Sequence, residues 1–217
     1  MTSIVVDGEC LNTMNDNDFS NIEKTSTSAL RTRYFGELKA HGFRYIPTQE
    51  EILTLVIGDP KPSDAPLVRI HSRCLTGDVF GSIQCECGEQ LEYSLEKMDS
   101  EGSGILIYLE QEGRGCGLVA KLRAYEMFEK DGIDTVDAYL RMNLPIDGRS
   151  YDAAVLILRY LGIQKLRLLT NNPLKIQAFN DSGIEVERVP IDIPPNPWNK
   201  DYLKTKKLRM GHLLGNL

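Results

Sequence analysis

The sequence predicts an α/β or α+β fold: a mixed sheet with helices, a strand-rich N-terminal half and βα units in the C-terminal half. Two observations predict this class. In residues 30–70, apolar and polar side chains alternate, and this two-residue period is typical of half-buried strands. From residue 89 onward, apolar side chains recur at helical spacing in segments that alternate with short apolar runs. Strands that alternate with helices are typical of βα units.

The expected elements follow in chain order from these periods and from the residues that interrupt them. In the first half, strands are expected within 43–46, 52–57 and 67–71, with a proline-rich loop over 58–66. In the second half, helices are expected at 89–101, 117–130, 151–161, 175–181 and 202–214, and strands at 105–109, 165–170 and 184–189. Gly102, Gly132 and Gly162 follow three of these helices, and glycine favours helix termination.

The N-terminal region differs in composition from the rest of the chain. Residues 1–28 are polar and rich in Asn, Asp, Ser and Thr, so we expect a tail or a loosely attached appendage there. A single domain is expected over 29–217, because a chain of this length can bury a sizeable core.

Charge and hydropathy limit the partners that this chain can take. Its net charge is −6 and its sequence pI is about 5.2, whereas nucleic-acid binding requires a basic surface. No segment approaches the ~20 apolar residues that span a bilayer, and the N-terminus lacks the pattern of a secretory signal. We therefore expect no nucleic-acid partner, no membrane partner and a cytoplasmic location.

Three of the five cysteines lie close together, at Cys74, Cys85 and Cys87. Such a cluster in a reducing compartment favours metal binding over a disulfide framework. A closed structural zinc site would need a fourth ligand, for which Cys116 and His71 are the candidates, whereas a catalytic site keeps one position for water. Buried cysteines without a metal are a third interpretation. We favour three thiolates plus water.

Seven motifs occur in one order between residues 69 and 214. They are RIHSRCLTGD (69–78), CECG (85–88), QEGRGCGL (111–118), KLRAY (121–125), DGR (147–149), LLTNNPLK (168–175) and MGHLL (210–214). In this combination, the chain resembles GTP cyclohydrolase II, the family that opens the guanine ring of GTP at the start of riboflavin biosynthesis.

The resemblance implies a zinc-dependent hydrolase with GTP as its small-molecule substrate. Water would attack C8 of the guanine, with release of formate and pyrophosphate. Catalytic Zn²⁺ would be held by Cys74, Cys85 and Cys87, and Mg²⁺ would accompany the substrate phosphates. The domain over 29–217 would be a GTP cyclohydrolase II-like catalytic domain, and the family precedent is a homodimer.

The resemblance also implies individual site residues. Tyr125 would lie near the guanine. Arg149 would be the nucleophile at the α-phosphate, with pyrophosphate leaving, and Asp147 would accept its proton. Because a guanidinium is a poor nucleophile, Arg149 could equally stabilise phosphoryl charge, with Asp147 orienting it. The implied nucleotide contacts are Arg69, Ile70, His71, Ser72, Arg73, Gln90, Glu112, Gly113, Arg114, Thr135, Thr170 and Lys175.

Arg73 departs from the family pattern, which usually has an acidic residue or Gln before the first zinc cysteine. A cation there replaces an acceptor with donors. Two alternatives therefore stay open: a paralogue that opens a purine nucleotide for another pathway, stopping at the formamide or keeping the triphosphate, and a silent zinc-stapled nucleotide-binding protein. Tyr125, Asp147, Arg149 and Lys175 together favour an enzyme.

Overall fold

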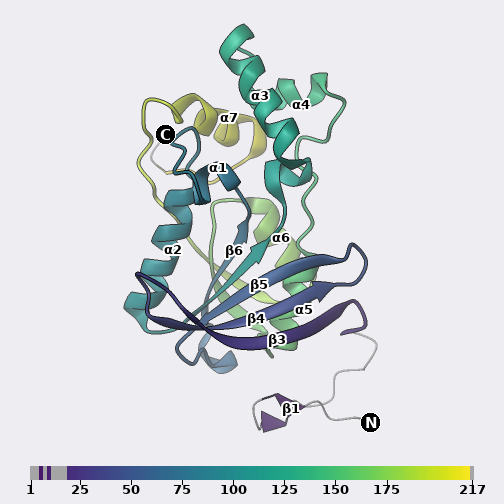
Figure 1. Ribbon diagram of the computed structural model, residues 1–217, viewed down its shortest axis with the longest axis vertical. Coiled ribbons are helices and arrows are strands. Elements are labelled where there is room, and N and C mark those ends of the chain that lie inside the picture. The colour runs from purple at the N-terminus through teal and green to yellow at the C-terminus, as the bar shows by residue number, and fades with distance from the viewer. Residues whose placement is uncertain (1–4, 7–8, 11–18, 216–217) are drawn as a thin grey trace.

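The computed structural model describes residues 5–6, 9–10 and 19–215, and its centre is one large sheet (Figure 1). The sheet has seven strands in the order β3-β4-β5-β7-β6-β8-β9. These strands are β3 (Ile22–Arg31), β4 (Glu37–Tyr45), β5 (Glu50–Ile57), β6 (Leu67–Ser72), β7 (Gly104–Leu109), β8 (Lys165–Leu169) and β9 (Glu185–Val189). Two short strands, β1 (Val5–Val6) and β2 (Glu9–Cys10), pair separately.

Helices connect most strands of the second half, as βα units require. They are α1 (Leu75–Asp78), α2 (Cys87–Glu101), α3 (Gly117–Asp131), α4 (Thr135–Arg141), α5 (Asp152–Tyr160), α6 (Pro173–Asp181) and α7 (Lys200–Met210), with 3₁₀ turns at Pro62–Asp64 and Glu112–Gly115. Within the described residues, no helix is both long enough and apolar enough to cross a membrane.

The predicted mixed sheet is confirmed. β3, β4, β5 and β7 form antiparallel pairs. β7, β6, β8 and β9 form parallel pairs. The strand-rich first half therefore supplies the antiparallel part of the sheet, and the parallel part is completed by strands from the second half.

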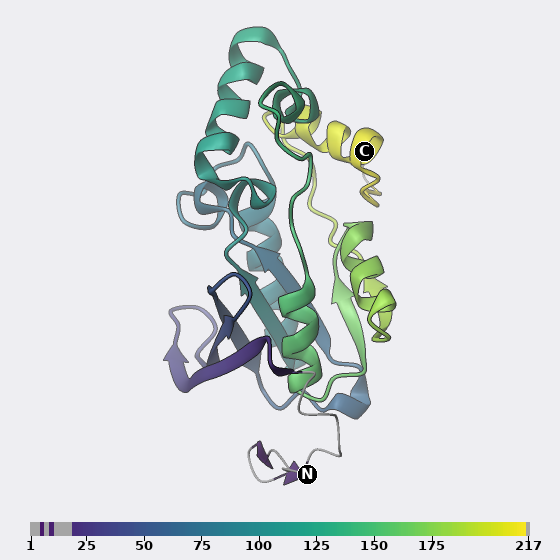
Figure 2. The same ribbon diagram turned by 90° about the vertical axis from the view of Figure 1, so that its right-hand side faces the viewer.

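The sheet is covered on both faces, because successive side chains of a strand point in opposite directions. On β7, Ile105 and Ile107 belong to one hydrophobic core together with residues of α5 and α6. Leu106, between them, belongs to a second core with Met98 of α2. Figure 2 shows α5 and α6 on the same side of the sheet. Burial on both faces explains why this strand reads as a continuous apolar run.

The expected boundary at residue 28 is wrong, because β3 already begins at Ile22. Residues 22–31 pair with β4 along its whole length. β3 is an edge strand, and beyond Ile22 its side chains are mostly exposed, so it lacks the apolar alternation that marks the inner strands. Main-chain hydrogen bonds hold it in the sheet. Most of the remaining expected tail lies outside the described residues.

Three helices differ from the sequence-based expectation, and one of them, the short α1, had not been predicted. The last helix ends at Met210 and not at 214, because Gly211 adopts the left-handed conformation that terminates helices. Helix α4 had not been predicted. It begins after Asp134, whose side chain accepts hydrogen bonds from the backbone N–H groups of Val136 and Asp137. This cap stabilises a helix of only seven residues.

Candidate active site

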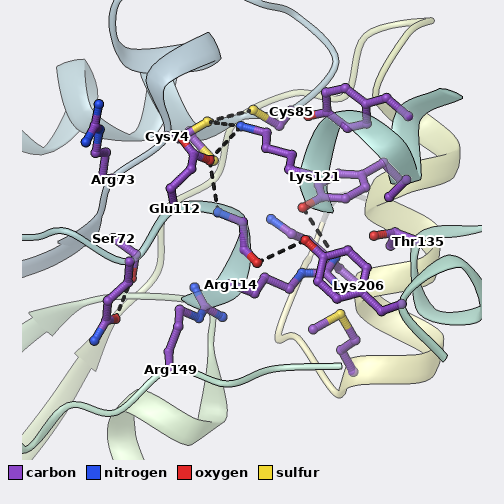
Figure 3. Close-up of a pocket in the computed structure, with 18 of the residues that line it drawn as sticks. Ser72, Arg73, Cys74, Cys85, Glu112, Arg114, Lys121, Thr135, Arg149 and Lys206 are labelled. Atoms are coloured by element: carbon purple, nitrogen blue, oxygen red, sulfur yellow. Dashed lines mark hydrogen bonds and ion pairs between the residues drawn. The ribbon is translucent and has the colours of Figure 1, made fainter. Parts of the chain in front are cut away.

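The main pocket lies beyond the carboxyl ends of parallel strands β6 and β7, where open α/β sheets commonly bind ligands. β6 is followed by Cys74, and β7 is followed by Glu112. Both residues line the pocket, which is open to solvent (Figure 3). The sheet therefore brings two of the seven motifs together beyond the carboxyl ends of these two strands.

The three predicted metal ligands meet in this pocket. The Sγ atoms of Cys74, Cys85 and Cys87 all lie within 4.8 Å of one another. The Cys74 and Cys85 sulfurs are 3.6 Å apart. Tetrahedral zinc with bonds of about 2.3 Å to sulfur requires sulfur–sulfur separations of about 3.8 Å. The geometry and the donor type therefore fit a metal site of three thiolates.

Neither candidate for a fourth protein ligand joins the cluster. His71 Nε2 lies 3.1 Å from the Asp78 carboxylate, and Cys116 Sγ donates to the Pro145 carbonyl at 3.7 Å. In the part of the chain that the structure describes, the group of possible metal ligands consists of the three cysteines. This arrangement is typical of an open catalytic site.

Lys121 on α3 contacts the thiolate cluster directly. Its Nζ donates to Cys74 Sγ at 2.9 Å, to Thr76 Oγ1 at 2.7 Å and to Glu112 Oε1 at 3.1 Å. Hydrogen bonds from Cys85 and Cys87, followed by the one from Lys121, lower the pKa of the Cys74 thiol. The lysine therefore offsets part of the negative charge that three thiolates accumulate.

Two glycines allow the cysteine-bearing segments to approach each other. A Cβ atom on Gly88 would lie 2.5 Å from the Gly77 carbonyl oxygen, and a Cβ on Gly77 would lie 3.2 Å from Cys74 Sγ. The first distance is far below a van der Waals contact. Gly77 follows Cys74 in α1, and Gly88 follows Cys87 in α2. Their close packing therefore sets the spacing between the first and third sulfurs.

We expect Gly88→Ala to disrupt the metal site without unfolding the sheet. The added methyl group would displace the Gly77 backbone, and such overpacking costs roughly 1–3 kcal/mol. Bound zinc, measured by elemental analysis, should fall to less than half of the wild-type ratio. Gly215→Ala is the control, because its Cβ would meet Asp192 at an ordinary 3.7 Å. Full zinc occupancy in Gly88→Ala would contradict this account.

A buried carboxylate, Asp78, positions the first ligand. Asp78 Oδ2 accepts hydrogen bonds from the Cys74 backbone N–H at 2.9 Å and from the Tyr108 hydroxyl at 2.7 Å. His71 is also bonded to it and stacks on Tyr108. Burial, the largest influence, lowers the pKa of His71 despite the Asp78 contact. Through Asp78, His71 therefore supports residues 74–87, which carry the three cysteines and which we call the metal loop.

The Glu112–Gly113–Arg114 loop adopts an uncommon backbone conformation beside the cluster. Gly113 and Arg114 both have left-handed φ values, 58° and 57°. At the non-glycine residue this conformation costs roughly 1 kcal/mol or more. Glu112 Oε2 accepts from the Leu75 N–H at 2.6 Å, and the Tyr139 hydroxyl donates to the Gly113 carbonyl at 2.9 Å. The loop is thus fixed from both sides.

Arg114 is held between two aromatic rings. Its guanidinium lies 5.5 Å from the Tyr139 ring centre and 5.6 Å from that of Tyr202. Cation–π contacts of this kind stabilise a buried positive charge. Burial alone would lower the pKa of Arg114, but the two tyrosines contribute to a net rise. Arg114 therefore presents a fixed cation to the pocket.

Asp147 and Arg149 form a bidentate ion pair at another side of the pocket. Arg149 Nε donates to Asp147 Oδ1 at 2.8 Å, and its NH2 group donates to Oδ2 at 2.5 Å. Burial lowers the pKa of Arg149, but the Asp147 hydrogen bonds outweigh burial and raise it above its ordinary value. The guanidinium stays protonated, which favours charge stabilisation over nucleophilic attack. Burial would raise the pKa of Asp147, but the hydrogen bonds from Arg149 outweigh burial and lower this pKa below its ordinary value.

Tyr125 lines the pocket near the cysteines, one helical turn after Lys121. Its hydroxyl is buried and has no hydrogen-bond partner in the described structure. Burial, followed by Tyr202 and the cysteines, raises its pKa. The phenol therefore stays protonated near neutral pH and offers a hydrogen bond to a ligand.

The predicted nucleotide contacts fall into two groups. Ser72, Arg73, Glu112, Gly113, Arg114 and Thr135 line the pocket. Arg69, Ile70, His71, Gln90, Thr170 and Lys175 do not line it and are buried or half-buried behind its wall. For this second group, contact with a nucleotide stays a prediction.

The second group forms a connected support. Arg69 NH2 donates to Gln90 Oε1 at 2.9 Å, and its NH1 donates to the Leu169 carbonyl at 3.0 Å. Lys175 Nζ donates to the Ile70 carbonyl at 2.7 Å. Burial, followed by the charges of Arg69 and Arg149, lowers the pKa of Lys175. These contacts tie the ends of β6 and β8 to the helices that follow.

Arg73, the departure from the family pattern, is paired away from the thiolates. Its NH1 group donates to Glu110 Oε2 at 2.6 Å. Figure 3 shows its side chain directed away from Cys74. The neighbouring acidic residue therefore neutralises this cation at the rim of the pocket.

Sequence reasoning gave no role to several residues that line the pocket. They are Gln111, Lys121, Ala124, Tyr139, Tyr202, Lys206, Met210 and His212. Two signals were available: Lys121 shares a helix face with Tyr125, and residues 210–212 lie within the last motif. Lys206 and Tyr202 had no such signal, because their role depends on the position of α7 across the pocket.

Comparisons with known proteins identify the family of this chain. A family model described as GTP cyclohydrolase II matches residues 23–190, so the similarity begins well before Arg69. GTP cyclohydrolase-2 of Acinetobacter baumannii strain SDF is 48% identical over 194 residues, which cover 88% of this chain and 96% of the relative. Riboflavin biosynthesis protein RibBA of Parabacteroides distasonis is 48% identical over 181 residues, 81% of this chain but 44% of the relative.

A solved structure from A. baumannii, RibBX, a two-domain 3,4-dihydroxy-2-butanone 4-phosphate synthase, has a TM-score of 0.45 and 21% identity over 80% of this chain and 41% of that chain. This likeness is too weak to add to the assignment. The family model covers most of the chain, and the relative from strain SDF aligns over nearly its whole length. The chain therefore belongs to the GTP cyclohydrolase II family.

Proposed function

We propose that this chain opens the guanine ring of GTP at C8 and releases formate and pyrophosphate, giving a diaminopyrimidinone ribotide for riboflavin biosynthesis. The observation that carries this proposal is the meeting of three thiolates and a cluster of cations in one pocket, within a chain of this family. The thiolates suit a metal that activates water, and the cations suit a triphosphate.

The charge of the pocket supports an anionic substrate. Five cationic side chains line it: Arg73, Arg114, Lys121, Arg149 and Lys206. Glu112 is the carboxylate among the lining residues, and it is already paired with Lys121. Four of these cations are paired with carboxylates, Arg73 with Glu110, Lys121 with Glu112, Arg149 with Asp147 and Lys206 with Glu86, but their N–H groups still gather at one pocket of a chain whose net charge is −6.

We propose zinc as the resident metal, held by Cys74, Cys85 and Cys87. When bound, zinc supplies a Lewis acid that lowers the pKa of water to near neutrality. Other side chains orient these cysteines and offset their charge. Asp78 fixes the Cys74 backbone, and Lys121 offsets thiolate charge.

The residues around the metal ligands orient the base. Tyr125 keeps its proton and has a free hydroxyl within the described structure, so it can donate a hydrogen bond to the guanine or to water. Both oxygens of Glu112 are engaged, by the Leu75 N–H and by Lys121. We therefore assign Glu112 a positioning role that joins the metal loop to α3.

Arg149 acts at the phosphates in this proposal. Its ion pair with Asp147 keeps it protonated and oriented, so it stabilises the charge that develops when pyrophosphate leaves. Arg114 supplies a second fixed cation. We propose that Mg²⁺ enters with the triphosphate, since magnesium commonly binds through substrate phosphates.

Mass spectrometry of the products from GTP tests the proposed function. With zinc and magnesium, the purified protein should give formate, pyrophosphate and a diaminopyrimidinone ribotide in equal amounts. A ring-opened product without formate would indicate an enzyme that stops at the formamide. Binding of GTP without turnover would indicate the silent zinc-stapled protein. Absence of both GTP binding and GTP turnover would exclude an enzyme that acts on GTP.

A further inference from the structure

One wall of the pocket comes from the C-terminal strap, which we define as residues 200–213, helix α7 and the turn after it. Tyr202, Lys206, Met210 and His212 of the strap line the pocket. The family-model match ends at residue 190. The last site residue that the family resemblance implies is Lys175. The strap therefore contributes to the site without any role yet assigned to it.

Ion pairs and main-chain hydrogen bonds hold the strap across the pocket. Arg209 donates to Asp134 at 2.6 Å and to Asp137 at 2.8 Å. These two carboxylates flank Thr135, which also lines the pocket. Four residues further along the chain from Arg209, the Leu213 N–H donates to the Asn171 carbonyl at 2.8 Å. The strap thus joins the start of α4 to the loop after β8.

The strap also contacts the metal loop. Lys206 Nζ lies 2.9 Å from Glu86 Oε1, and Glu86 stands between Cys85 and Cys87 in the chain. Both side chains are largely buried, at 12% and 3% exposure. An ion pair at this depth fixes the strap firmly, because separating it would leave two buried charges unpaired.

His212 is the strap residue with an unsatisfied polar atom. Its Nδ1 is buried and has no hydrogen-bond partner within residues 19–215. Burial, followed by the charges of Lys206 and Arg149, lowers the pKa of His212 to about 3, and a contact of the ring with the Met210 backbone opposes this fall only in part. The imidazole is therefore neutral, with one ring nitrogen carrying a hydrogen. A buried donor among cations is stabilised when an anionic oxygen pairs with it.

We propose that the strap is a nucleotide-contacting part of the active site, in which His212 donates a hydrogen bond through Nδ1 to a phosphate oxygen, and Arg209 is a positioning residue. The identity of the nucleotide rests on the proposed function. The phosphate contact rests on the pocket itself: His212 lines the same cavity as Arg114, Arg149 and Lys206.

Equilibrium dialysis of the zinc-loaded full chain with inorganic triphosphate tests the contact. His212→Leu should weaken triphosphate binding by roughly tenfold to a hundredfold, the effect of one hydrogen bond to a charged group. Guanosine, which lacks phosphate, should bind within about twofold of wild type. His212→Asn keeps an N–H group near the Nδ1 position and should recover most of the affinity.

Arg209→Ala tests the positioning role away from the cavity. It should raise the KM for GTP by about tenfold and change kcat by less than threefold, since it loosens a wall but removes no contact with the reacting atoms. Arg209→Lys should recover part of the loss. Lys204→Ala is the matched control, because Lys204 is exposed and pairs with Asp201 within the same helix. Zinc content and the urea midpoint should match wild type in all variants.

The outcomes separate this inference from the proposed function. Unchanged triphosphate affinity in a folded His212→Leu variant, or no triphosphate binding by the wild type, would overturn the phosphate contact. An Arg209→Ala variant with the wild-type KM, or a Lys204→Ala variant equally impaired, would overturn the role of the strap. A wild type that binds triphosphate through His212 but does not open GTP would leave the strap assignment intact and refute the proposed function.

Discussion

Cys85→Ser is expected to abolish bound zinc and turnover of GTP together. Cys85 is buried, and its sulfur lies 3.6 Å from that of Cys74. A serine hydroxyl is a poor zinc ligand near neutral pH, so two thiolates would remain for a metal that requires at least three protein ligands. Zinc per chain should fall below about one tenth, and formate release should fall at least a thousandfold.

Cys116→Ser is the matched control for this prediction. Cys116 is one of the two candidate fourth ligands that the structure places outside the cluster, and its sulfur donates to the Pro145 carbonyl. The variant should retain zinc and most activity. Elemental analysis and a formate assay on the same preparations supply the measurement. An active, metal-free Cys85→Ser protein would refute the zinc mechanism, and loss of zinc in Cys116→Ser would restore the closed four-ligand site.

Arg149→Ala is expected to stop pyrophosphate release while ring opening continues. The guanidinium is held on Asp147 and lies in the pocket wall, whereas the cysteines and Tyr125 come from separate elements. Removing one such charge-stabilising group costs about a hundredfold to a thousandfold in rate. Formate and pyrophosphate should therefore be measured separately, and formate should be released without pyrophosphate.

Two further variants distinguish charge from nucleophilicity at this position. Arg149→Lys keeps a positive charge and should retain part of the pyrophosphate release, which a strict requirement for a guanidinium nucleophile would not allow. Arg149→Ala leaves Asp147 largely buried without its partner, so stability should be followed by urea unfolding. Arg123→Ala, at an exposed position on α3, is the control. Simultaneous loss of both products with zinc retained would contradict a role limited to phosphate.

Much of the fold could be predicted because its inner elements carry strong local signals. The continuous apolar run at 105–109 and the glycine at 102 placed β7 and the end of α2 closely. β3 could not be predicted, since an edge strand with exposed faces is recognised through its partner strand. Helix α4 was not predicted from the sequence, because this short helix depends on the Asp134 cap for its stability.

The metal site could be predicted from the sequence, whereas the residues around it could not. Three cysteines in one short stretch are visible in the sequence, whereas Lys206 and Glu86, which pair at 2.9 Å, stand 120 positions apart. The same holds for Lys121, whose contact with Cys74 bridges 47 positions. Contacts of this kind exist through tertiary packing alone. The homodimer implied by the resemblance stays a prediction, which analytical ultracentrifugation would check.

The position of β6 between β7 and β8 has a consequence for biosynthesis of the chain. Residues 74–87 carry the three thiols, and they leave the ribosome long before β8 has been made. Until β8 pairs with β6, the segment that presents Cys74 lacks one of its two neighbouring strands. Early in synthesis the thiols are therefore open to oxidation and to other metals. We therefore expect the proposed metal to be loaded late, after β8 has completed the sheet.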